Sequence, residues 1–191
     1  MSLADLAIAL ALAWGAGLRA YAVIFAVGLA GALGWVELPG HLEVLQHPVV
    51  LAASGLMTLV EFGADKLPWL DSMWDAVHSF IRIPAGAALA AMAFGDSSSA
   101  VMVAAAILGG SLAAAMHAAK AGARAAINLS PEPFSNWAAS LSEDALVPIG
   151  LWLAIAHPLV FFVLLAACLI AALLLLRLVW RGVRRLTSSA T

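Results

Sequence analysis

Apolar stretches long enough to cross a membrane alternate with short polar segments along the whole chain. A membrane-spanning helix needs about 20 mainly apolar residues. The pattern predicts six such helices, at residues 3–33, 48–62, 81–94, 100–119, 136–156 and 159–180, with the fourth helix continuing to Asn128. The sequence therefore predicts an all-α, polytopic membrane protein with about six spans, formed by residues 1–191 as a single domain.

The first apolar stretch is too long for one straight span. At 1.5 Å per residue it would reach about 45 Å, whereas the hydrocarbon core of a bilayer is about 30 Å thick. Gly15, Gly17 and Arg19 lie in its middle. We expect this helix to be either strongly tilted or broken near Gly15 and Gly17.

A shorter amphipathic segment lies between the second and third predicted spans. Residues 67–78 place two tryptophans and other apolar residues on one side of a helix. The opposite side carries a polar stripe with helical spacing: Asp71, Asp75, His78 and Arg82. This pattern is typical of a helix that lies in the membrane interface, so the sequence predicts a separate short interfacial helix here.

Composition agrees with membrane insertion and excludes other classes. The chain of 191 residues is 64% hydrophobic and 10% charged, whereas soluble domains have about 45–50% apolar and about 25% charged residues. The net charge of −2 says nothing about nucleic acid, but the lack of a basic patch with interleaved aromatics argues against a nucleic-acid partner. Cys168 is the only cysteine, so the chain forms no internal disulfide.

Lysine and arginine set the expected orientation, because these residues favour the cytoplasmic side of the membrane. With six spans and the arginines near residue 181 inside, both termini are predicted to be cytoplasmic in an inner membrane. Lys66 and Arg177 then also fall inside, and the predicted outer loops contain no lysine or arginine. The predicted partners are the lipid bilayer, an ion or small solute, and a second copy in a homo-oligomer.

Two short strings suggest an internal repeat. The string A-G-L-R-A at residues 16–20 resembles A-G-A-R-A at residues 121–125. Halves 1–96 and 97–185 would each hold three spans, so they would be inverted relative to each other, as in many transporters. The His-Pro pairs at residues 47–48 and 157–158 suggest a different register. The sequence therefore leaves the inverted repeat open.

Arg19 is predicted to lie in the middle of the first span. A charge at the bilayer centre costs between about 2.5 and more than 10 kcal/mol, so it normally faces a cavity or a partner. We consider an anion site, an ion pair with Glu61 or Glu143, or a purely structural ion pair.

Carboxylates form the second group of candidates. Glu61, Asp65, Glu143 and Asp144 are predicted to form an ion or proton pathway, and the last two could also neutralise nearby cations. In the polar stripe, carboxylates and imidazole could bind a metal or relay protons, or form a solvated surface. No His-x-x-x-His pair or second cysteine is present, so we predict no metal site and no cofactor.

A cationic stripe and a proline-rich segment complete the candidates. His117, Lys120, Arg124 and Asn128 recur at helical spacing. With Arg19 they are predicted to contact an anionic headgroup or a phosphorylated ligand, the alternative being ordinary anchoring at the inner surface. The two prolines in residues 130–136 (S-P-E-P-F-S-N) exclude a helix interior, which places Ser135 and Asn136 in a loop.

Several of these strings together resemble an uncharacterised family of small bacterial membrane proteins, the DUF4126 domain. They are G-L-R-A-Y at residues 17–21, E-F-G-A-D-K-L-P-W-L-D-S-M-W-D-A-V-H at 61–78, I-P-A-G-A at 83–87, and S-P-E-P-F-S-N at 130–136 with the acidic pair at 143–144. The likeness extends over nearly the whole chain. It implies a multi-span helical membrane protein and brings no established activity and no catalytic residues.

Three functions fit the sequence. The first is a small transporter or channel for an ion or small solute, because charges of both signs lie within or beside the spans. The second is a non-catalytic scaffold or regulatory subunit in which Glu61 or Asp65 pairs with Lys120 or Arg124. The third is an enzyme acting on a lipid phosphate, although no phosphate-binding loop or nucleophile motif is present.

Overall fold

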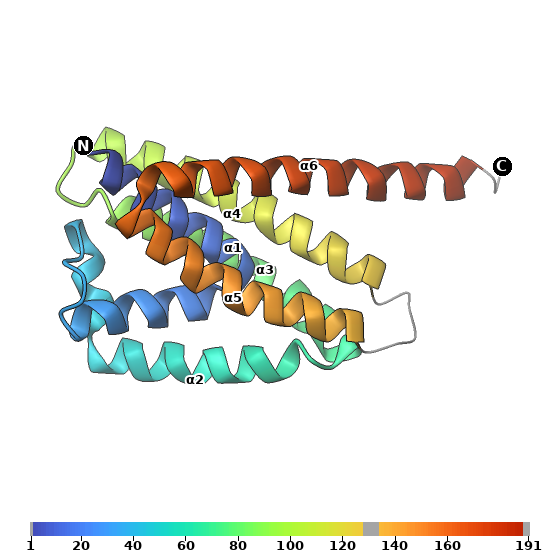
Figure 1. Ribbon diagram of the computed structural model, residues 1–191, viewed down its shortest axis with the longest axis horizontal. Helices are drawn as coiled ribbons and strands as arrows, with labels where there is room; N and C mark the ends of the chain where they lie inside the picture. Colours follow the sequence, from blue (N-terminus) through green and yellow to red (C-terminus); the bar gives the residue numbers. More distant parts are fainter. Residues whose placement is uncertain (1, 128–133, 189–191) are drawn as a thin grey trace.

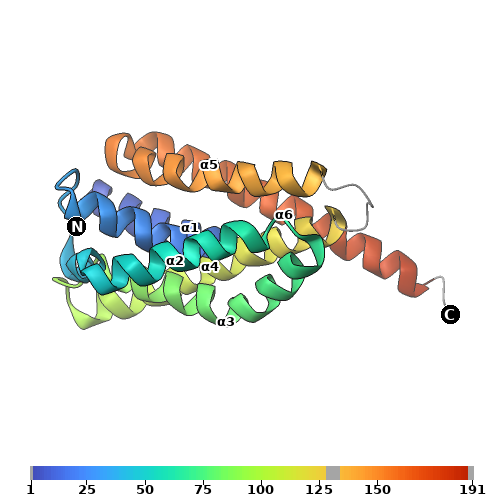
Figure 2. The same cartoon turned by 90° about the horizontal axis from the view of Figure 1, so that it is seen from below.

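The computed structural model describes residues 2–127 and 134–188, and this part of the chain is helical throughout, without a strand. The predicted all-α class is therefore confirmed. The helices are α1 (Leu3–Ala32), the 3₁₀ helix η1 (Gly40–Gln46), α2 (Pro48–Ala64), α3 (Pro68–Met92), α4 (Ser99–Ile127), α5 (Phe134–Ala156) and α6 (Pro158–Ser188). The α-helices lie side by side in one elongated bundle (Figures 1 and 2).

The helix starts follow from local sequence. Ser2 caps α1, because its hydroxyl accepts from the Asp5 N–H while the Asp5 carboxylate accepts from the Ser2 N–H. Helices α2, α3 and α6 begin at Pro48, Pro68 and Pro158. Proline suits this position because the first N–H groups of a helix have no partner within it.

Four helices in the described part, α1, α4, α5 and α6, are long and apolar enough to cross a membrane, and η1 with α2 forms a fifth candidate bent by 73°. The protein is thus a helical membrane protein, as predicted. The count of six spans is not confirmed.

The first helix is broken at Arg19, whose φ of −148° and ψ of 80° are not helical. A side chain added at Gly15 would come within 2.7 Å of Val23 Cγ2, although eight residues of straight helix span about 12 Å. Residues 3–18 and 20–32 therefore fold back on each other, and we call them the α1 hairpin. The prediction of a break was right in kind, but the break lies at Arg19 rather than at Gly15 and Gly17.

The α1 hairpin changes the topology. Its first half runs into the bundle and its second half returns to the end from which the chain started, so the start of α1 and the end of α6 lie at opposite ends of the bundle (Figure 1). The prediction that both termini are cytoplasmic is therefore not confirmed. It counted α1 as one straight crossing, whereas α1 is broken at Arg19.

The predicted interfacial helix does not exist as a separate element, because residues 68–92 form the single helix α3, which continues through Pro84. Its apolar residues Val77 and Phe80 are 58% and 85% exposed, while Arg82 is fully buried. Asp75, His78 and Arg82 of the polar stripe therefore face the interior of the bundle. A bilayer favours this orientation, because lipid accepts apolar side chains and charged side chains turn inward.

Small residues let the helices approach closely at the centre of the bundle. A side chain on Gly17 would clash with the backbone of α4, and one on Gly150 would clash with the buried ring of Trp14. Trp14 in turn contacts Phe161 of α6 edge to face. The inverted repeat is not confirmed, since the A-G-L-R-A string lies at the break of α1 whereas its proposed counterpart lies in the continuous helix α4.

Candidate functional site: a buried ion-pair network

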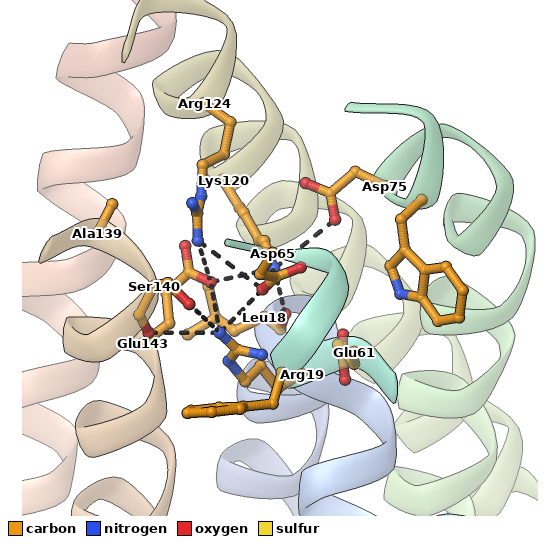
Figure 3. A network of polar contacts seen from close by, with 12 residues as sticks. Leu18, Arg19, Glu61, Asp65, Asp75, Lys120, Arg124, Ala139, Ser140 and Glu143 are labelled. Atoms are coloured by element: carbon orange, nitrogen blue, oxygen red, sulfur yellow. Dashed lines mark hydrogen bonds and ion pairs between the residues drawn. The ribbon is translucent and has the colours of Figure 1, made fainter. Parts of the chain in front are cut away.

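Charged side chains from five helices meet at the tip of the α1 hairpin (Figure 3). All four cations of this group are at most 4% exposed. We call the group the ion-pair network; it consists of Arg19, Arg82, Lys120 and Arg124 with Glu61, Asp65, Asp75, Glu143 and Asp144. Glu61 and Asp65 come from the end of α2, and the other carboxylates come from α3 and α5.

Asp65 is the centre of the network. Its Oδ2 lies 2.8 Å from Arg19 Nη2, 3.3 Å from Lys120 Nζ and 3.8 Å from Arg124 Nη2. Its backbone carbonyl accepts from the side-chain amide of Asn136 at 3.0 Å, which fixes α5 to the end of α2.

Arg19 connects the hairpin tip to α5. Its Nε lies 2.9 Å from Asp144 Oδ1, and its Nη2 donates to the hydroxyl of Ser140 at 3.1 Å. Lys120 Nζ donates to the carbonyl of Leu18 at 3.2 Å. That carbonyl ends the first half of the hairpin, and the carbonyl end of a helix is partially negative. The lysine therefore stabilises the break itself.

Arg82 bridges two carboxylates. Its Nη2 donates to Glu61 Oε1 and its Nη1 donates to Asp75 Oδ1, and both Arg82 and Glu61 are fully buried. Lys120 Nζ is 3.6 Å from the same Asp75 oxygen. Asp75 thus links the Arg82 bridge to the part of the network around Asp65.

Carboxylates outnumber cations in the network by one when all groups are ionised. Four carboxylate oxygens have no hydrogen-bond partner among the described residues: Glu61 Oε2, Asp65 Oδ1, Asp75 Oδ2 and Asp144 Oδ2. Burying an unpaired charge is costly. The network therefore has the capacity to take up a proton or another cation.

His117 and Ser79 extend the network toward the surface, in an arrangement unsuited to nucleophilic catalysis. Arg82 can only donate, so His117 Nδ1, at 3.3 Å, accepts from it, and His117 Nε2 then donates to Ser79 Oγ at 2.6 Å. The Ser79 hydroxyl donates to the Asp75 carbonyl at 2.9 Å. The histidine therefore does not act as a base toward this serine.

A cavity of about 240 Å³ borders the network between α3 and α4. Its polar lining residues are Asp75, Ser79, His117 and Arg124, and the rest of the lining is alanine. It opens beside Ala76 and Ala125, which are exposed. Two larger cavities in the described part of the bundle, of about 260 and 430 Å³, are lined by apolar residues. A third, of about 340 Å³, also borders the network, because Lys120 and Glu143 are among its otherwise apolar lining.

The structure brings together most residues that the sequence singled out. The expected pairings of Asp65 with Lys120 and Arg124 are present, as is the pairing of Arg19 with Glu143 at 3.8 Å. Glu61 pairs with Arg82 instead. The cations that were expected to contact an anion or headgroup face inward, and that role stays a prediction.

Other sequence-based expectations changed. Ser135 and Asn136 are not in a loop, since α5 begins at Phe134 and contains both. Asn128 and the side chain of Asp71 lie outside the described residues. Ser79 and Ser140 were missed, because serines are common in helices and carry no distinguishing pattern. Among the described residues, no group of three His, Cys, Asp or Glu side chains is arranged to hold a metal ion.

The family described as "Domain of unknown function (DUF4126)" matches residues 6–178, so the chain belongs to this family, as its sequence resemblance indicated. No curated protein and no solved structure matches the chain. The family description assigns no activity, and the function has to be argued from the geometry of the network.

Proposed function

We propose that the protein is a small membrane transporter for an ion or small solute, and that the ion-pair network is its binding and gating element. The observation that carries this proposal is a buried network with one excess carboxylate, located at the tip of a broken helix and bordered by a polar cavity. Broken helices that place charged groups within the membrane are a recurring feature of transporters.

The proposed membrane placement has five crossing helices, α2 to α6, and an α1 hairpin that enters and leaves on one side. Each half of the hairpin holds about 15 residues, or about 22 Å of helix. The network then lies in the half of the bilayer toward which α2, α4 and α6 run. Lys66 follows the end of α2, and Arg177 and Arg181 lie in the last part of α6. Since lysine and arginine favour the cytoplasm, this end is inside and the start of α1 is outside.

In this conformation, apolar packing separates the network from the outer end of the bundle. Toward the outer end, the hairpin packs through Leu12, Trp14 and Phe161, all fully buried, and apolar side chains close that route. Transport then requires the hairpin to shift against α4 and α5. The shared pairings of Asp65 and Lys120 suit such a shift, because each charge has several partners and can exchange one for another.

Reconstitution into proteoliposomes tests this proposal. Flux of protons, alkali ions and small organic ions should exceed that of empty vesicles, and Glu61→Gln should reduce it at least tenfold. Glu43→Gln is the matched control, because it removes an exposed carboxylate of η1 far from the network. No flux above empty vesicles, or equal flux in both variants, would rule out the transporter.

One observation favours the alternative of a scaffold or regulatory subunit. Asp65 contacts three cations at once, as expected of a group that locks helices together. If the protein is a scaffold, the double exchange Asp65→Lys with Lys120→Asp should restore the stability lost in either single variant. The wild type should then show no flux. The third function, an enzyme acting on a lipid phosphate, gains no support from the Ser79 and His117 arrangement.

A further inference from the structure

The cavity between α3 and α4 offers two hydrogen-bond acceptors, Asp75 Oδ2 and Ser79 Oγ. Asp75 is 3% exposed and lines this cavity, and its Oδ2 has no partner among the described residues while its Oδ1 is held by Arg82. Ser79 donates its only proton to a backbone carbonyl and accepts from His117. A hydroxyl oxygen has two acceptor lone pairs, so one remains.

The two Nη groups of Arg124 and both ring nitrogens of His117 have partners outside the cavity or on its wall. Arg124 donates to the backbone and side chain of Asn136 and to Glu143, both on α5. His117 uses both ring nitrogens, one toward Arg82 and one toward Ser79. The lining residues therefore do not favour an anion, although two of them are basic.

We propose that this cavity binds one small monovalent cation, either an alkali ion or a primary ammonium group, on Asp75 Oδ2 and Ser79 Oγ. The cation balances the excess carboxylate of the network. A volume of about 240 Å³ holds about eight water molecules at about 30 Å³ each, which suits a partly hydrated ion or a short amine. A divalent metal is disfavoured, because no cluster of three ligating side chains is present in the described part of the chain.

If the protein is the proposed transporter, this site identifies a small monovalent cation as the ion that it transports or to which transport is coupled. This part of the inference rests on the proposed function. A cation on Asp75 competes with Lys120, whose Nζ is 3.6 Å from Asp75 Oδ1 but 3.0 Å from Glu143 Oε2. Binding would therefore shift Lys120 toward Glu143 and Asp65. Because Lys120 also holds the Leu18 carbonyl at the hairpin break, occupancy of the cavity is linked to the hairpin.

The test is equilibrium binding of ²²Na⁺ to the purified full-length protein in detergent, with unlabelled Na⁺, K⁺ and methylammonium as competitors. We expect saturable binding of about one ion per chain, displaced by at least one competitor. The order of potency of the competitors distinguishes an alkali-ion site from an ammonium site. Asp75→Asn should weaken binding at least tenfold, and Ser79→Ala should weaken it severalfold. Asp96→Asn, which alters an exposed carboxylate at the opposite end, should bind as the wild type does.

Two results would overturn the site: no saturable displacement by any of the three cations, or undiminished binding in folded Asp75→Asn and Ser79→Ala. Proton uptake without cation binding also overturns it. Ser79→Ala keeps the test decisive if Asp75→Asn fails to fold. Binding without flux in proteoliposomes would refute the transporter and leave the site in place. Flux in proteoliposomes without cation binding at Asp75 would support the transporter and overturn the site.

Discussion

Arg82→Gln is the sharpest probe of the network, because Arg82 bridges the buried carboxylates of Glu61 and Asp75. The guanidinium is fully buried and donates to both Glu61 and Asp75. Glutamine is shorter and uncharged, so it leaves Glu61 without its cation. Asp75 keeps only the longer contact to Lys120 at 3.6 Å.

The expected loss of stability is large. Removing one partner of a buried ion pair typically costs about 3–5 kcal/mol, because the remaining charge stays buried and uncompensated. Adding Glu61→Gln removes one of those charges, so the double variant should be more stable than the sum of the single changes predicts. Contacting residues show coupling energies of about 0.5–3 kcal/mol, and the upper half of that range is expected here.

Reversible unfolding in mixed detergent, followed by far-UV circular dichroism, measures these free energies for the wild type, both single variants and the double variant. Arg177→Gln serves as the control, because this arginine is exposed on α6 and surface substitutions usually change stability by less than about 0.5 kcal/mol. If Arg82→Gln is destabilised by less than about 1 kcal/mol, or if the double variant is simply additive, the network does not contribute as argued.

Three further predictions concern the hairpin and Asp65. Gly17→Val should destabilise by at least about 1–3 kcal/mol through overpacking against α4, whereas Gly63→Ala, which meets nothing within 4 Å, should be neutral or stabilising; thermal melting in detergent separates them. In a cysteine-free background, Ser2→Cys and Phe134→Cys should react with a membrane-impermeant thiol reagent from opposite sides, and labelling from one side would refute the hairpin. Asp65 contacts three buried cations, and removing one partner of a buried ion pair typically costs about 3–5 kcal/mol. Asp65→Asn should therefore lower the melting temperature in detergent, and an unchanged melting temperature would contradict this assignment.

The sequence predicted most members of the network but few of its contacts. Charges are rare in an apolar chain, so Glu61, Asp65 and Glu143 were recognisable without a structure. Their partners depend on which helix faces which, and spacing along one helix does not contain that information. Arg82 illustrates this, since its helical spacing assigned it to a surface stripe whereas the fold makes it the bridge between α2 and α3.

The sequence by itself determined the class of protein, the helices and the residue types available for chemistry. Apolar length specifies a membrane helix, and proline at a first turn marks its start. Only the tertiary structure decided that the chain reverses at Arg19, which places the start of α1 and the end of α6 at opposite ends of the bundle. The reversal depends on distant groups, because Lys120, Ser140 and Asp144 hold the two sides of the break from α4 and α5. In the sequence, the only sign of the break is two glycines and an arginine. These residues do not show in which direction the chain continues after the break.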